Sequence, residues 1–211
     1  VWFSVTRGLA GWRTLDAKPT FVVYAGEVPF YTFADQYADG ASAVITRSRN
    51  HTHQSLDPKV KHTSRMHLNL SDLEARDVDP TAWPIMLDME GNIAEGSGSN
   101  VFVVSGSSIK TPSDATILRG VTRDVVIELA DQLGIPLSEE AIQPYDVYTA
   151  DEVFFTSTPF SVLPVTSVDR REIGDGRPGP IATRLLAAFS ELAGIDIVDQ
   201  AQRYKDARSD N

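Results

Sequence analysis

Cysteine is absent from the 211-residue sequence. Its absence excludes a disulfide-bonded scaffold, a thiolate zinc site and a cysteine nucleophile. Long apolar runs are absent as well: no stretch approaches the roughly 20 residues of a transmembrane helix, so we predict no membrane partner. Positive charge is scarce, because 19 lysines and arginines stand against 29 aspartates and glutamates, giving a formal charge of −10. This acidity argues against nucleic acid as a partner, since phosphates attract positive charge.

The residues that are present have the composition of a globular domain, with 42% hydrophobic and 23% charged side chains. We therefore predict a cytoplasmic protein with a complete hydrophobic core. The first residues, VWFSV, are apolar and prone to form a strand, with no methionine and no polar lead-in. We expect that an N-terminal portion of the whole protein precedes them.

Runs of β-branched and aromatic residues predict strands that are separated by turn residues. The expected strands lie in residues 1–8, 21–30, 41–48, 84–96, 100–111, 151–158 and 162–169, with a turn inside each of the segments 84–96 and 100–111. The polar segment 31–40 is expected to cross between two subdomains. Hairpins outnumber strand–helix–strand units, which predicts an α+β fold with a mixed, mostly antiparallel sheet.

Three further segments have helical periodicity. The first runs from residue 63 or 64 to residue 76 and has an apolar stripe at Met66, Leu70 and Leu73. The second, residues 120–134, is the strongest, because five apolar side chains share one face. The third, residues 179–192, has a proline in its first turn, where the missing N–H costs nothing. We expect the tail, residues 201–211, to be dispensable.

Two polar segments invite functional interpretations that their context does not favour. His51 and His53 are two positions apart, so on a strand they would point to the same side, as two metal ligands can. However, the chain has no cysteine and no HExxH motif. We therefore interpret them as surface histidines and predict no metal site. The segment EGSGSN, residues 95–100, matches neither the serine motif GxSxG nor the phosphate motif GxGxxG. We predict that its glycines let the backbone bend or pass close to another group.

Lys61 precedes the first helix, where a lysine is more often a solvated charge. Glu95 and the helix start at Thr122 change this interpretation, because together with Lys61 they suit pyridoxal phosphate. A lysine with a lowered pKa can bond to an aldehyde, and a carboxylate such as Glu95 can keep a pyridine nitrogen protonated. The amides and the hydroxyl at the start of a helix, where Thr122 follows an Arg-Gly turn, can hold a phosphate. The sequence therefore predicts a pyridoxal phosphate site.

Four segments resemble, in the same order, those of the class IV (fold type IV) pyridoxal-phosphate aminotransferases. They are VKHTSRMHLNLSDLEAR, LDMEGNIAEGSGSNVFVV, ILRGVTRDVVIELADQLGI and ADEVFFTSTPFSVLPVTSVDRREIGDGRPGPI. The family includes branched-chain aminotransferases, D-amino acid aminotransferases, (R)-selective amine transaminases and aminodeoxychorismate lyases. The resemblance is best over residues 45–190, and the spacing of Lys61 and Glu95 fits the family pattern.

The resemblance implies roles for individual residues. Lys61 resembles the lysine that bonds to the cofactor and shuttles protons, and Glu95 resembles the partner of the pyridine nitrogen. Leu118 is similar to the residue that packs on the ring face. The residues that resemble phosphate ligands are Val121 through its amide, and Thr122 and Thr158 through their hydroxyls. Asn100 belongs to the motif, and we interpret it as structural.

The resemblance also implies a domain organisation. Residues 37–211 correspond to a large C-terminal domain that has a mixed, mostly antiparallel sheet with flanking helices. Residues 1–36 correspond to the end of a smaller N-terminal α+β domain, whose earlier part would carry an arginine for the phosphate and much of the substrate pocket. A homodimer is implied as well, because a loop from a second subunit usually completes the sites of this family.

The implied activity is transamination between an amino donor and a 2-oxo acid acceptor, with branched-chain or similar hydrophobic amino acids as the leading substrates. D-amino acid or (R)-amine transamination, the aminodeoxychorismate lyase reaction and a catalytically incompetent structural subunit stay open as alternatives. Two residues depart from the pattern of relatives. Met66 stands where branched-chain members usually have a tyrosine, and Pro159 has no N–H where relatives offer one to the substrate carboxylate. These departures leave the substrate and its stereochemistry open.

Overall fold

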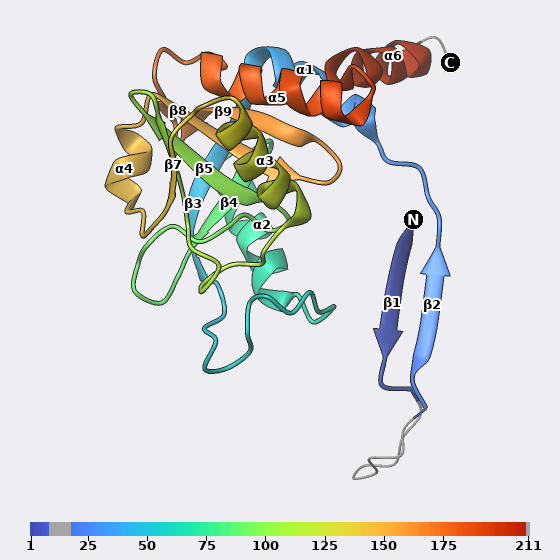
Figure 1. The fold of residues 1–211 in the computed structure, drawn as a ribbon. Helices are drawn as coiled ribbons and strands as arrows, with labels where there is room; N and C mark the ends of the chain where they lie inside the picture. Colours follow the sequence, from blue (N-terminus) through green and yellow to red (C-terminus); the bar gives the residue numbers. More distant parts are fainter. Residues whose placement is uncertain (9–17, 210–211) are drawn as a thin grey trace.

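The computed structural model describes residues 1–8 and 18–209. Its first two strands, β1 (Trp2–Thr6) and β2 (Thr20–Tyr24), pair antiparallel into a ribbon. The ribbon stands apart from the rest of the molecule (Figure 1), and its side chains are mostly exposed. Both predicted strands are present, although the second ends before Gly26 and Pro29 instead of reaching residue 30. Glycine and proline both weaken strands, which accounts for the earlier end.

The main body is built on one mixed sheet with the strand order β4-β3-β9-β8-β5-β6-β7, and β10 pairs with β9. Strand β3 runs parallel to β4 and β9, and β6 runs parallel to β7, while the other pairs in this sheet are antiparallel. Its strands are β3 (Ala41–Arg49), β4 (Trp83–Leu87), β5 (Asn100–Ser105), β6 (Ser108–Thr111), β7 (Leu137–Glu139), β8 (Glu152–Ser157), β9 (Ser161–Val168) and β10 (Arg171–Glu172). The predicted α+β fold with a mixed sheet is confirmed.

Helices surround this sheet (Figure 1). Helices α3 and α5 pack on β8, and α2 packs on β3 and β4. The helices are η1 (Phe30–Phe33, a 3-10 turn), α1 (Ala34–Asp39), α2 (Met66–Val78), α3 (Val121–Gln132), α4 (Pro144–Tyr148), α5 (Pro180–Ala193) and α6 (Ile197–Ser209). Within residues 1–8 and 18–209, none of them combines the length and the hydropathy needed to cross a membrane.

The hydrophobic core is centred on β5 and β8, whose side chains are buried along almost their whole length. Phe102 and Phe154 stack across these strands with their ring centroids 4.9 Å apart, and both are fully buried. Val126 and Leu129 of α3 belong to the same core, as the periodicity of residues 120–134 predicts. Gly134 then takes a φ of 66° after the helix, a conformation that glycine adopts without a steric penalty. The central strands and α3 thus form a rigid base for the loops between them.

Helix α2 is present as predicted, but its apolar stripe faces outward. Met66, Leu70 and Leu73 are 71%, 47% and 60% exposed, whereas Ser71 and Ala75 are fully buried. The small side chains let the helix approach β3 and β4 closely, and the Ser71 hydroxyl is satisfied by a bond to the Leu68 carbonyl at 2.7 Å. Hydrophobicity alone therefore indicated the wrong face, because close packing selected the smaller residues.

The segment 31–40 is not the polar crossing that its sequence suggests. Phe33, Ala34 and Tyr37 are buried in the main core, and the Tyr37 hydroxyl donates to the Phe160 carbonyl at 2.8 Å. Phe33 and Ala34 thus share one core with Tyr37, on both sides of the division at residue 36. The division into domains 1–36 and 37–211 stays a prediction.

The tail is also more than a dispensable extension, although residues 210–211 lie outside the described residues. Residues 201–209 belong to α6, whose Ile197 and Ala201 are buried in the core. The Tyr204 ring meets Phe30 edge to face at 5.6 Å between centroids. Helix α6 therefore covers η1 and α1. The sequence did not indicate this packing, because the two partners lie far away along the chain.

We expect Ile197→Ala to lower the free energy of unfolding by about 2–4 kcal/mol, the usual cost of truncating a buried isoleucine. The control is Val198→Ala on the same helix, because Val198 is 40% exposed while Ile197 is 8% exposed. Urea unfolding of both variants provides the measurement. Equal losses would contradict the docking of α6 on the core.

Candidate active site

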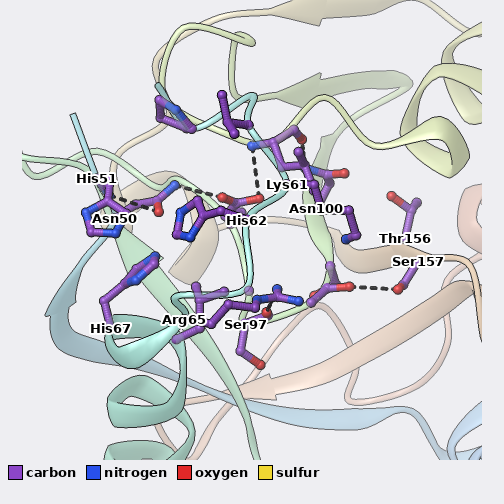
Figure 2. A pocket seen from close by; sticks show the side chains of 18 of the residues that line it. Asn50, His51, Lys61, His62, Arg65, His67, Ser97, Asn100, Thr156 and Ser157 are labelled. Carbon is purple, nitrogen blue, oxygen red and sulfur yellow. Dashed lines mark hydrogen bonds between the residues drawn. The ribbon is translucent and has the colours of Figure 1, made fainter. Parts of the chain in front are cut away.

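A cavity of about 670 Å³, including its open mouth, lies where four segments meet at one end of the sheet (Figure 2). The segments are residues 50–68 from the end of β3 into the first turn of α2, residues 95–100 before and at the start of β5, residues 118–122 at the start of α3, and residues 156–158 at the end of β8. Five predicted site residues line the cavity: Lys61, Glu95, Leu118, Thr122 and Thr158. Val121, the sixth, is not among the lining residues, and it is 78% exposed as the first residue of α3.

Glu95 is the buried acid of this cavity, with only 9% of its surface exposed. Its two oxygens accept hydrogen bonds from different directions: the Asn50 amide donates to Oε1 at 2.8 Å, and the Leu118 N–H donates to Oε2 at 3.2 Å. Burial raises the pKa of Glu95 to about 7, and these two hydrogen bonds, followed by the charges of Arg65 and Lys61, oppose the rise. The two hydrogen bonds therefore fix the position of the carboxyl group, and burial brings its pKa close to neutral.

Lys61 borders the same cavity, with its chain exposed and its amine partly enclosed. This partial burial, followed by the charge of Arg65, lowers the pKa of Lys61 below its ordinary value, while the charge of Glu95 acts in the opposite direction. A lowered pKa increases the share of neutral amine near neutral pH, and the neutral amine is the form that can attack a carbonyl or accept a proton.

The start of α3 forms another wall of the cavity. Its N-cap residue is Gly120, so no side chain caps the first-turn amides. A Cβ atom at Gly120 would lie 2.3 Å from the Asn100 Oδ1, which explains why glycine is needed there. Asn100 in turn donates to the Leu118 carbonyl at 2.9 Å, in agreement with its predicted structural role. Uncapped amides at a helix N-terminus favour an anion.

Several hydroxyl groups line the same cavity. Thr122 lies in the first turn of α3 and is buried, and Thr158 follows the end of β8. The Thr156 hydroxyl is buried and has no hydrogen-bond partner among the described residues, whereas the Ser157 hydroxyl donates to the Gly98 carbonyl at 2.7 Å. A buried hydroxyl without a partner is costly, so a polar ligand in the cavity would relieve this cost.

The glycine-rich segment 95–100 bends around the cavity. A Cβ atom at Gly96 would lie 2.3 Å from the Ser99 hydroxyl and 3.1 Å from the Pro84 carbonyl. Gly96 therefore permits a close approach that no other residue would, as the sequence predicts for the glycines of this segment. Gly98 does not show it, because a Cβ atom there would meet nothing within 4 Å.

Three histidines line the cavity, which corrects the interpretation of His51 as a surface residue. The His51 and His67 rings have centroids 3.9 Å apart, and the His62 ring lies 5.7 Å from His51 and 6.3 Å from His67. His53 is exposed, as predicted. No group of three histidine, aspartate or glutamate side chains in the described part of the chain is arranged to hold a metal ion.

We expect His67 to make stability dependent on acid. Burial, followed by the charges of His51, His62 and Arg65, lowers the pKa of His67 to about 4. The unfolded chain, with a pKa near 6.5, therefore takes up a proton first, and stability falls as the pH drops from 6.5 through about 4. Unfolding measured across this window should show less acid sensitivity in His67→Gln than in the wild type, with the exposed His53→Gln as the control. Parallel curves for His67→Gln and the wild type would refute the prediction.

Asn50, Arg65 and Thr156 belong to the site but were not foreseen. Asn50 follows directly after β3, and a polar residue at the carboxyl end of a parallel strand is a signal that could have identified it. Arg65 donates to the Ser97 carbonyl at 2.7 Å, and nothing in the sequence indicates this contact between distant segments. Thr156 comes beside the segment 95–100 through the pairing of β8 with β5.

Comparisons with known proteins agree with this arrangement. Residues 1–168 match the family Amino-transferase class IV. A protein of Methanocaldococcus jannaschii that is provisionally named a branched-chain-amino-acid aminotransferase is 36% identical over 206 residues, which are 93% of this chain and 69% of that protein. The branched-chain-amino-acid aminotransferase of Pseudomonas aeruginosa is 44% identical over 108 residues, 51% of this chain and 35% of that enzyme.

Solved structures show the same similarity. The branched-chain amino acid aminotransferase of Escherichia coli superposes with a TM-score of 0.79 and 28% identity, covering 90% of this chain and 63% of that chain. The branched-chain amino acid aminotransferase of Thermobaculum terrenum, in its PLP-form, gives a TM-score of 0.76 and 25% identity, covering 97% of this chain and 65% of that chain. The present chain thus spans less than two thirds of either structure. On the family match and these relatives together, the chain belongs to the class IV aminotransferases.

Proposed function

We propose that the whole protein is a pyridoxal-phosphate-dependent aminotransferase that transfers an amino group from a branched-chain or similar hydrophobic amino acid to a 2-oxo acid. The donor becomes a 2-oxo acid and the acceptor becomes an amino acid. The observation that carries the proposal is the convergence of Lys61, Glu95 and the uncapped start of α3 on one cavity, from three distant parts of the chain. The names of the relatives support the same activity and substrate class.

The residues of the cavity fit pyridoxal phosphate. The Lys61 amine would bond to the aldehyde, and the Glu95 carboxylate would pair with the protonated ring nitrogen. The Leu118 side chain offers an apolar contact for the ring. The phosphate would be held by the first-turn amides of α3 with Thr122 and Thr158, and the unsatisfied Thr156 hydroxyl is a further donor. The Thermobaculum terrenum relative was solved as the holo-form with this cofactor, which supports the choice.

The chain contributes acid–base and electrostatic effects to this chemistry. When bound, the pyridine ring of the cofactor supplies the electron sink for charge that develops on the substrate carbon. Glu95 would hold the ring nitrogen in its protonated form. The Lys61 Nζ would take the proton from the substrate carbon and deliver it to the carbon that came from the cofactor aldehyde. Such proton transfer by a positioned group is typically worth ~10²–10⁴-fold in rate.

A donor screen with the full-length protein tests the proposal. L-leucine, D-alanine and an (R)-amine are each paired with 2-oxoglutarate or pyruvate, and we expect L-leucine to give the fastest turnover. A preference for D-alanine or the (R)-amine would overturn the proposed substrate class but would still support transamination. Release of pyruvate from aminodeoxychorismate without an amino acceptor would replace transamination with the lyase reaction. A full-length protein that binds no cofactor would instead support a structural subunit.

The assembly and location are part of the same proposal. We propose that residues 1–36 end a smaller N-terminal domain, that two copies of the whole protein form a homodimer, and that the protein is cytoplasmic. Light scattering of the full-length protein tests the dimer, for which a mass of a single copy would be the contrary result.

A further inference from the structure

Asn50 is buried beneath the cavity, and every polar group of its side chain has a partner. It is 4% exposed, and its backbone N–H donates to the Leu87 carbonyl at 2.9 Å. Its Oδ1 accepts the His51 N–H at 3.0 Å, which leaves the two hydrogens of Nδ2 to point toward the cavity wall. One of them is donated to Glu95 Oε1 and the other to the Thr116 carbonyl, both at 2.8 Å. The orientation of the amide is therefore fixed.

These bonds join Glu95 to the segment 112–120 before α3. The Leu118 N–H closes the connection by donating to Glu95 Oε2 at 3.2 Å. Asn50 thus touches both the carboxylate and the segment that presents Leu118 to the cavity. A change at Asn50 would release the carboxylate and this segment together.

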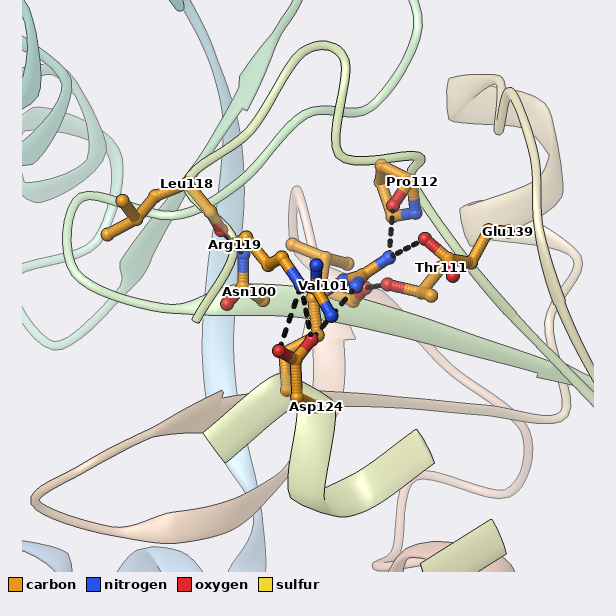
Figure 3. Close-up of polar contacts among 9 residues, drawn as sticks. Asn100, Val101, Thr111, Pro112, Leu118, Arg119, Asp124 and Glu139 are labelled. Atoms are coloured by element: carbon orange, nitrogen blue, oxygen red, sulfur yellow. Dashed lines mark hydrogen bonds and ion pairs between the residues drawn. The ribbon is translucent and has the colours of Figure 1, made fainter. Parts of the chain in front are cut away.

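The far ends of this segment have independent anchors (Figure 3). Arg123, which is 1% exposed, donates to the Pro112 carbonyl at 2.9 Å and forms an ion pair with Glu139. Near the other end, the Asn100 amide donates to the Leu118 carbonyl at 2.9 Å. Because these contacts hold both ends, loss of Asn50 should act on the middle of the segment and on Glu95 without unfolding α3.

Asn50 also affects the charge of Glu95. The Asn50 hydrogen bond is the largest of the effects that oppose the burial of Glu95, ahead of the Leu118 N–H and the charges of Arg65 and Lys61. The other titratable side chains on the cavity are His51, His62 and His67. An amide donor favours the ionised carboxylate, because it bonds more strongly to an anion than to a neutral acid.

We propose that Asn50 is a positioning residue of this site: its amide holds the Glu95 carboxyl group and joins it to the 112–120 segment, so that Glu95 and Leu118 meet the cofactor ring in one fixed geometry. This inference rests on the proposed function, because the ring is that of pyridoxal phosphate. Asn50 itself acts only through Glu95 and Leu118.

The first test uses the cofactor-free full-length protein and follows the pH titration of the Glu95 carboxyl carbon by NMR. Asn50→Leu removes both donated hydrogens, and we expect the midpoint to rise by about one unit or more, as for the loss of a hydrogen bond to a charged group. The matched control is Asn69→Leu on the exposed face of α2, which should leave the midpoint unchanged. An unchanged midpoint in folded Asn50→Leu would overturn the inference.

Asn50→Asp answers the same question if Asn50→Leu fails to fold. It keeps the side-chain shape and the acceptor for the His51 N–H, but it replaces the donor to Glu95 with a second acid. The Glu95 midpoint should again rise, and a constant midpoint would overturn the inference.

The second test measures the holoenzyme. We expect Asn50→Leu to lower kcat about 10- to 100-fold, the equivalent of one hydrogen bond to a charged group, with a smaller change in KM for the donor. A fall confined to KM would count against a positioning role. If wild-type protein binds no cofactor, the proposed function fails; if it turns over and Asn50→Leu matches it, only the present inference fails.

Discussion

Lys61→Ala in the full-length protein is expected to abolish the covalent attachment of pyridoxal phosphate and to lower turnover by at least ~10²–10⁴-fold, the range for loss of a positioned acid–base group. The physical reason is that alanine offers neither an amine for the aldehyde nor a group that can move the proton at the substrate carbon. The fold should be retained, because the Lys61 side chain is exposed at the mouth of the cavity. Visible absorbance of the bound cofactor and steady-state kinetics provide the measurements.

Lys59→Ala is the matched control for this prediction. Lys59 lies two residues before Lys61, pairs with Asp57 at 3.2 Å and is 43% exposed. Surface ion pairs of this kind contribute little to stability, so the variant should bind the cofactor and turn over as the wild type does. Retained turnover in Lys61→Ala, or an equal loss in Lys59→Ala, would show that a different amine is responsible.

Glu95→Gln should have the second largest effect, a loss of kcat on the order of 10²-fold, as for removal of one preorganised electrostatic group. A glutamine has a single acceptor oxygen, whereas two donors, the Asn50 amide and the Leu118 N–H, converge on the carboxylate of Glu95. One donor would therefore face the new NH₂ group, and the ring nitrogen would lose its negatively charged partner. Glu90→Gln, an exposed position in the turn after β4, is the control.

The same variant should change the pH dependence of stability in the cofactor-free protein. Because burial raises the pKa of Glu95 from 4.5 to about 7, the folded state holds a proton that the unfolded state has lost, and stability falls as pH rises through this window. Glu95→Gln should remove this fall. The effect of His67 has the opposite sign in the overlapping range, so each variant must be compared with the wild type. An unchanged slope in Glu95→Gln would argue against the raised pKa.

The site could be predicted from the sequence where local motifs carry it. Lys61, Glu95 and Thr122 lie in segments whose turn and helix signals are local, and the structure brings them to one cavity. Asn50 and Arg65 escaped prediction, since their partners Glu95, Thr116 and Ser97 lie far away in the sequence. Such contacts depend on how strands pair, which no local pattern records.

The fold was predictable within the same limit. The central strands and α3 were foreseen, because their apolar residues repeat with the correct period and end at clear stop signals. The buried face of α2 was not, since close packing on β3 and β4 favours Ser71 and Ala75 over the larger apolar residues. Helix α6 was missed because its sequence is mostly polar, although its Ile197 and Ala201 are buried in the core.

The central claim is that the Lys61 amine bonds to the aldehyde of pyridoxal phosphate while Glu95 faces the ring nitrogen. Borohydride reduction of the full-length protein with pyridoxal phosphate, followed by proteolysis and mass spectrometry, tests it most directly. We predict that the reduced cofactor is found on the peptide that contains Lys61, and that Lys59 and Lys110 stay unlabelled. Label on another lysine, or no label at all, would contradict this claim.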